Sequence, residues 1–141
     1  MFGNDAEFRA FAIAEKWFDD DQLSEPLSNE DAIEISRKCS TLLRPRSSQE
    51  DLFDNDRLVV ITRGEKATVV FSAALDKARL FDVARLPTDE HLIDTTGAGD
   101  AFVGGVLCAL AQDFDLDQSI ELGHKAAFKI IQTQGCDVSV I

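Results

Sequence analysis

Residues 94–102 read Asp-Thr-Thr-Gly-Ala-Gly-Asp-Ala-Phe, and an almost wholly apolar stretch follows them to about Gln112. Gly97 and Gly99, set among small residues, let the backbone approach an anion closely at the start of a helix. The helix dipole adds about half a positive charge at that end. The stretch therefore predicts a turn into a helix whose amide groups suit a phosphate or a phosphoryl group in transit.

Asp100 lies inside this turn, although a carboxylate repels phosphate. One interpretation is that it accepts the proton of a substrate hydroxyl that attacks the γ-phosphoryl group. The other is that it caps the helix, as aspartates often do. Position alone leaves both open. The apolar stretch favours the first, because it predicts a helix start inside the protein, where an unused carboxylate is costly.

Helices are expected before this motif. The first runs over residues 5–17, with Asn4 as its cap and no strand in front of it. The second begins at Ser28, which forms an S-x-x-D capping pattern with Asp31. Its apolar face consists of Ala32, Ile35, Cys39 and Leu42. The polar residues 45–56 end this helix and form a linker.

The remaining elements complete an α/β pattern. The uninterrupted apolar run 58–61 predicts a strand buried on both faces of a parallel sheet. Two further short strands are expected at residues 67–71 and 78–83. A last helix is predicted over residues 116–132, capped by Asp115 and stopped by Gly135. Its inner side carries Ile120, Gly123, Ala127, Ile130 and Ile131.

Residues 94–102 resemble the C-terminal signature of the ribokinase-like (PfkB) carbohydrate kinase family almost residue for residue. The resemblance implies that Asp100 is the catalytic base and that the amides of Gly97, Ala98 and Gly99 form an anion hole. It also implies a mostly parallel sheet with helices on both faces. Residues 1–141 would be the incomplete C-terminal, ATP-binding portion of that fold, without the N-terminal substrate-binding half and the lid.

Two more segments agree with the family, in its order. Residues 4–7 resemble its N-x-x-E motif, which implies that Asn4 and Glu7 organise Mg²⁺ through water. The plain alternative is a helix cap with first-turn acids. Residues 62–64 resemble a T-x-G turn, which implies that Thr62, Arg63 and Gly64 contact the ATP phosphates. The alternative is an ordinary turn at the end of a strand, although ligands of such sheets do bind beyond the carboxyl ends of strands.

The last helix carries a third region of resemblance, Gly123 to Ala127 followed by Gly135 and Cys136. By that resemblance His124, Ala127 and Ile131 line the adenine pocket of ATP. The alternative for His124 is a histidine whose hydrogen-bonding needs are met within its helix.

The activity implied is that of a kinase with an alcohol acceptor, using ATP and Mg²⁺. The expected acceptor is a nucleoside, adenosine, giving ADP and AMP as in purine salvage. Thr96 is typical of the sugar-phosphorylating members, so a ribose- or fructose-type acceptor stays as an alternative. A non-catalytic nucleotide-binding fragment is a further one, and residues 1–141 alone are expected to be inactive.

Composition narrows the class of protein. A net charge of −12 disfavours nucleic acid and anionic membrane surfaces as partners. Cys39, Cys108 and Cys136 have no metal-site spacing and fit a reducing, cytoplasmic or nuclear compartment. Cys108, within the apolar stretch, is expected in the core. The complete protein is expected to be a monomer.

Overall fold

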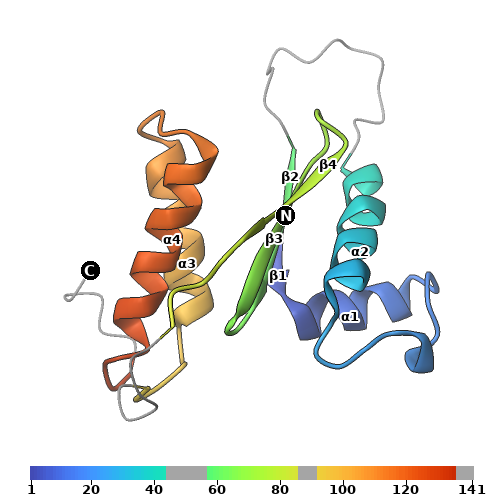
Figure 1. The fold of residues 1–141 in the computed structure, drawn as a ribbon, viewed down its shortest axis with the longest axis horizontal. Helices are drawn as coiled ribbons and strands as arrows, with labels where there is room; N and C mark the ends of the chain where they lie inside the picture. Colours follow the sequence, from blue (N-terminus) through green and yellow to red (C-terminus); the bar gives the residue numbers. More distant parts are fainter. Residues whose placement is uncertain (44–56, 86–91, 136–141) are drawn as a thin grey trace. The chain divides into compact units, whose positions relative to one another are not determined.

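The computed structural model describes residues 1–43, 57–85 and 92–135. The chain divides into two compact units, residues 1–82 and 83–141, and each is described by itself. The first unit contains β1 (Phe2–Asn4), α1 (Asp5–Ala14), a 3₁₀ turn (Asp20–Gln22), α2 (Asn29–Leu42), β2 (Leu58–Arg63), β3 (Lys66–Ser72) and β4 (Lys77–Phe81). The second contains α3 (Ala98–Leu110) and α4 (Leu116–Ile130), as Figure 1 shows.

The four strands form one mixed sheet in the order β1-β2-β3-β4. β1 runs parallel to β2, with Phe2 opposite Val60 and Asn4 opposite Thr62. The pairs β2-β3 and β3-β4 are antiparallel. The α/β class is thus confirmed, but the expectation of no strand before the first helix is wrong. β1 is too short to show a periodic pattern, and its parallel pairing with β2 defines it as a strand.

The core of the first unit lies between the sheet and its two helices. Val59 and Ile61 of β2 share a cluster with Val69 and Phe71 of β3, because alternate residues of a strand point to the same face. α1 and α2 cover that face in Figure 1. They contribute Phe8, Ala12, Ala32, Ile35 and Cys39 to the cluster. Leu42 does not belong to this face as predicted, since its side chain is 54% exposed.

Side-chain caps set the helix starts. Asn4 and Glu7 form a reciprocal capping box at α1, and Ser28 and Asp31 form another at α2. Both starts agree with the sequence prediction. α1 ends at Ala14 rather than near residue 17, because Lys16 adopts a left-handed φ of 57° that no helix continues through.

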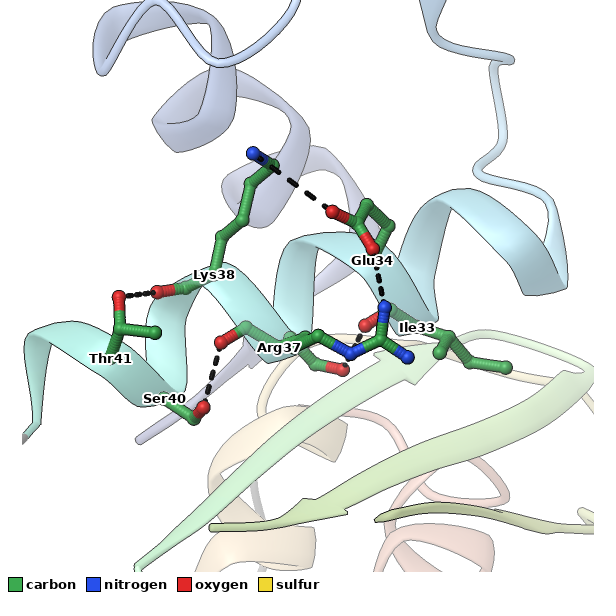
Figure 2. A network of polar contacts seen from close by, with 7 residues as sticks. Ile33, Glu34, Arg37, Lys38, Ser40 and Thr41 are labelled. Atoms are coloured by element: carbon green, nitrogen blue, oxygen red, sulfur yellow. Dashed lines mark hydrogen bonds and ion pairs between the residues drawn. The ribbon is translucent and has the colours of Figure 1, made fainter. Parts of the chain in front are cut away.

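The polar side of α2 is a solvated helix surface (Figure 2). The Glu34 carboxylate pairs with Arg37 at 2.7 Å and with Lys38 at 3.9 Å. The hydroxyls of Ser40 and Thr41 donate to carbonyls three residues earlier in the same helix. The exposed ion pairs of Glu34 contribute roughly 0–1 kcal/mol. Every hydrogen-bond and ion-pair partner drawn in Figure 2 lies within α2, so this network is structural.

The second unit is a helical hairpin whose two helices carry glycines where their backbones come closest together. A Cβ added to Gly105 of α3 would lie 2.9 Å from Cα of Gly123 in α4. Phe102, Val106 and Ala109 of α3 are buried against this contact, with Ile120, Ala126 and Ile130 of α4. Small residues therefore let the two helix backbones approach closely.

α3 is apolar nearly all round but buried along one side only. Leu107 is 52% exposed and Leu110 37% exposed. The expectation that Cys108 belongs to the core is wrong, because it is an exposed free thiol on the open side. The start of α3 is not buried either, since Gly99 and Asp100 are exposed. An apolar sequence shows no preferred side, so its outer face could not be identified in advance.

Three sequence expectations fall at or beyond the limits of the described residues. The linker at 45–56 and Cys136 lie outside them. α4 is capped by Asp115 as predicted and ends at Ile130, before Gly135, which has a φ of 72°.

No helix within residues 1–43, 57–85 and 92–135 has the length and apolar character to cross a bilayer.

Candidate functional site

The start of α3 presents amide groups without acceptors. Gly97 is its N-cap, at φ 79° and ψ −1°, and no side chain caps the helix. The first bond to the cap runs from the Ala101 N–H to the Gly97 carbonyl at 2.9 Å. The Ala98 N–H donates to the Thr95 carbonyl at 3.2 Å, whereas those of Gly99 and Asp100 have no acceptor among the described residues. An anion placed here would meet two free amides and the positive end of the helix dipole.

This geometry refines the predicted anion hole. The left-handed conformation belongs to Gly97, whereas Gly99 lies in α3 with no such φ. The Ala98 N–H is already hydrogen-bonded to the Thr95 carbonyl. The amides that lack an acceptor among the described residues are those of the next two residues, Gly99 and Asp100. That the Asp100 N–H lacks an acceptor among the described residues could be anticipated only once the first residue of the helix was known.

The Asp100 carboxylate lies three residues after the N-cap, in the first turn of α3. It is exposed, and within the described residues it has neither a hydrogen-bond partner nor an ion-pair partner. Asp100 therefore does not act as the cap of this helix, which was the alternative interpretation. An unpartnered carboxylate beside two free amides can receive a proton from a hydroxyl group held next to it.

Asp94 is a residue whose part in this region the sequence analysis missed. Its Oδ1 accepts the Thr96 N–H at 2.8 Å, and its Oδ2 accepts the Gly135 N–H at 3.1 Å. These hydrogen bonds hold the pKa of the Asp94 carboxyl below its usual value, and the bond from the Thr96 N–H has the largest effect. An aspartate two residues before a turn amide is a recognisable local pattern, but the bond to Gly135 has no sequence signal.

The three residues predicted to line the adenine pocket lie on or just after α4. His124 is partly buried, with its ring centroid 5.2 Å from that of Phe102 in α3. Burial lowers the pKa of His124 and so favours the neutral ring. This packing fits the interpretation of a histidine held within its helix pair. Ala127 and Ile131 are partly buried, and the Ile131 carbonyl accepts the Ile93 N–H at 2.8 Å.

Asn4 and Glu7 adopt the capping arrangement that was the plain alternative for them. Asn4 Oδ1 accepts the Glu7 N–H at 2.9 Å, and Glu7 Oε2 accepts the Asn4 N–H at 2.8 Å. Both residues are exposed. No cluster of three or more metal-binding side chains occurs in the described part of the chain. One carboxylate and one amide oxygen form a donor set that suits a Mg²⁺ contacted through water, because Mg²⁺ usually keeps several waters.

Thr62 lies beside that cap, because β1 and β2 are parallel neighbours. Asn4 is opposite Thr62 in the strand register, and the Thr62 hydroxyl donates to the Gly3 carbonyl at 3.4 Å. Gly64 follows at the exposed hairpin turn with a φ of 59°. The first unit thus gathers Asn4, Glu7 and Thr62 at the carboxyl ends of two parallel strands, where ligands of α/β sheets bind.

Arg63 was predicted to contact ATP, but its side chain turns into the first unit. It is 4% exposed and donates to the Ala67 carbonyl at 2.6 and 2.9 Å. Further bonds reach the Leu27 carbonyl at 3.3 Å and Asn29 Oδ1 at 2.7 Å. Burial lowers the pKa of the guanidinium, and the charge of Asp5 opposes that shift. This side chain braces the β2-β3 hairpin against the start of α2.

Two groups of predicted site residues result, one in each unit. Asn4, Glu7, Thr62 and Gly64 belong to the first. Gly97, Ala98, Gly99, Asp100, His124, Ala127 and Ile131 belong to the second. Each group is assembled by contacts inside its own unit.

Comparison with known proteins identifies the family of this chain. Residues 1–141 match the model of the pfkB family carbohydrate kinases. "Adenosine kinase 2" of Arabidopsis thaliana is 33% identical over 136 residues, which are 96% of this chain and 34% of the relative. "Adenosine kinase" of Schizophyllum commune is 48% identical over 80 residues, 56% of this chain and 23% of the relative.

Solved structures agree. Anopheles gambiae adenosine kinase has 35% identity and a TM-score of 0.74, over 96% of this chain and 35% of that one. Schistosoma mansoni adenosine kinase in complex with adenosine and AMP has 25% identity and a TM-score of 0.74, over 97% of this chain and 34% of that one. This chain spans about a third of the length of these relatives. It belongs to the pfkB family of carbohydrate kinases.

Proposed function

We propose that residues 1–141 are the ATP-binding and catalytic portion of a kinase that phosphorylates a hydroxyl of adenosine. The observation that carries this is the start of α3, where the exposed Asp100 carboxylate and the amides of Gly99 and Asp100 have no partner among the described residues. Several relatives that align with this chain bear the name adenosine kinase. The other two thirds of a complete kinase would supply the groups that hold the nucleoside.

The proposed reaction is an in-line transfer. The Asp100 carboxylate takes the proton of the attacking hydroxyl, the hydroxyl oxygen forms a bond to the γ-phosphorus, and the bond to the ADP oxygen breaks. The two free amides stabilise the charge on the transferring group. Asn4 and Glu7 would hold Mg²⁺ through water. When bound, the ion would neutralise part of the phosphate charge.

The remaining predicted residues bind the nucleotide in this proposal. Thr62 and the backbone of Gly64 contact the ATP phosphates. The buried guanidinium of Arg63 does not reach them, and it holds the turn in place through its hydrogen bond to Asn29. Ala127 and Ile131 form an apolar side for adenine, and His124 adds a neutral ring packed on Phe102.

The acceptor can be tested directly. Thr96, typical of sugar-phosphorylating members, is the observation that keeps ribose or fructose as a second candidate. A complete version of the kinase, in which residues 1–141 are joined to the substrate-binding portion, should be assayed with adenosine, ribose and fructose. We expect the highest kcat/KM for adenosine. A preference for a sugar would replace the nucleoside proposal while retaining the kinase one.

The base is tested by Asp100→Ala in the complete kinase. We expect kcat to fall by roughly 10²–10⁴ through loss of a general base. ATP binding should survive, since a negative charge near phosphate is removed. Asp113→Asn is a matched control, because Asp113 is an exposed carboxylate at a positive φ that asparagine tolerates. A fall of less than about threefold for Asp100→Ala would contradict the role of Asp100 as a base.

A further inference from the structure

The loop in front of α3 is tied to the end of α4. Ile131, the C-cap of α4, has a carbonyl that accepts the N–H groups of Ile93 at 2.8 Å and Asp94 at 3.3 Å. The Asp94 carboxylate adds the bond to the Gly135 N–H at 3.1 Å. Three hydrogen bonds therefore join two segments that lie about forty residues apart in sequence.

Asp94 is the only side chain in that set, and it uses both of its oxygens. One holds the Thr96 N–H at 2.8 Å and so shapes its own loop. The other reaches across to Gly135. The low pKa of the Asp94 carboxyl agrees with this arrangement, because bonds from N–H groups favour the charged form.

The turn that faces the phosphate begins immediately after these bonds. Thr96, held by Asp94, precedes Gly97, whose left-handed conformation directs the chain into α3. The positions of the Gly99 and Asp100 amides therefore depend on where residues 94–96 lie. Ile131, whose carbonyl accepts the bonds from this loop, is one of the residues proposed to face adenine.

We propose that Asp94 is a positioning residue, which fixes the Gly97–Asp100 turn on the end of α4 so that the phosphate side and the adenine side of the nucleotide site keep one geometry. This inference rests on the proposed function. Without the carboxylate, the hydrogen bonds that remain between this loop and the end of α4, among the described residues, are the two to the Ile131 carbonyl. A displacement near 1 Å at a transferring group can lower the rate by about 10²-fold.

Two substitutions separate the two bonds of Asp94. Asp94→Ala removes both acceptors. Asp94→Asn keeps an oxygen for the Thr96 N–H but presents an NH₂ group to the Gly135 N–H, where two donors meet. The matched control is Asp115→Ala, which removes an acceptor for the Gln118 N–H at 2.8 Å at the opposite end of α4.

Kinetics in the complete kinase give the first readout. For Asp94→Ala we expect kcat/KM for ATP to fall by roughly 10- to 100-fold, with a smaller fall for Asp94→Asn. Asp115→Ala should lower Tm and leave kcat/KM within about twofold, because it weakens a helix cap away from the turn. Asp94→Ala with turnover within about twofold of the parent would overturn the inference.

Amide hydrogen exchange on residues 1–141 gives a readout independent of activity. Asp94→Ala should speed the exchange of the Thr96, Ala98 and Ala101 amides, which are hydrogen-bonded in this turn, and Asp115→Ala should not. Unchanged exchange in Asp94→Ala, with Asp100 still essential for turnover, would refute the positioning role alone. Faster exchange together with a dispensable Asp100 would refute the proposed function and leave the structural role of Asp94 standing.

Discussion

Backbone conformation distinguishes the two glycines of the turn in front of α3. Gly97 has a φ of 79°, where a side chain is strained, whereas Gly99 is helical with nothing within 4 Å of an added Cβ. Gly97→Ala should therefore lower the free energy of unfolding by about 1–2 kcal/mol. Gly99→Ala should leave it unchanged or raise it by up to about 1 kcal/mol. Urea unfolding of both variants measures the difference, and equal losses would show that no left-handed residue is needed at position 97.

His124 makes stability depend on pH in a defined direction. Its pKa is lowered by burial from 6.5, so the unfolded chain binds a proton more readily than the folded one. The stabilisation is complete above pH 6.5 and is lost as the pH falls from there towards the folded pKa. We expect Tm to drop between pH 7.5 and 5.5, and to drop less in His124→Gln. Identical pH profiles would contradict the burial argument.

Residue roles with local causes could be predicted from the sequence. The caps Asn4, Ser28 and Asp115 were all placed correctly, since a cap bonds to an amide three residues on. Roles that depend on distant partners could not. Asp94 binds Gly135 and Arg63 binds Leu27, and both partners become neighbours only in the fold.

At the scale of the elements, the α3–α4 contact gives a matched pair of glycines. A Cβ on Gly105 would meet Gly123 Cα at 2.9 Å, but a Cβ on the adjacent Gly104 would meet nothing within 4 Å. Gly105→Ala should destabilise the hairpin by about 1–3 kcal/mol, because backbone atoms cannot yield as a flexible side chain can. Gly104→Ala should stabilise it by about 0.5–1 kcal/mol. Thermal unfolding of the two variants provides the measurement. Similar effects from both would mean that the helices do not pack at Gly105.

Element types were predictable where a pattern is long enough to be periodic. β2, β3, β4 and all four α-helices were expected near their observed bounds. β1 was missed, because three residues carry no periodic signal and its partner β2 lies more than fifty residues away. The open side of α3 was missed for a related reason, since an apolar helix does not show in its own sequence which side its neighbours cover.

At the scale of the whole molecule, each of the two units holds its own group of predicted site residues. The strand ends that carry Asn4 and Thr62 belong to the first, and the start of α3 belongs to the second. The chain spans about a third of its relatives, and we propose that the groups that hold an acceptor lie in the rest of a complete kinase. Nucleotide binding and turnover should therefore separate when residues 1–141 are studied alone.

We expect residues 1–141 to show no adenosine-dependent ATP consumption. In-line transfer needs the acceptor hydroxyl held against the γ-phosphoryl group, and such positioning accounts for roughly 7–11 kcal/mol of a barrier. Asp100 and the free amides of α3 would act on an unplaced nucleoside, so the remaining catalysis should be close to that of a solvated carboxylate. The measurement compares purified residues 1–141 with the complete kinase, and with its Asp100→Ala variant as the inactive reference. Turnover by residues 1–141 at the level of the complete kinase would contradict the placement of the acceptor site outside this chain. Turnover well below that of the Asp100→Ala variant would locate the missing contribution in substrate positioning, because the carboxylate is still present.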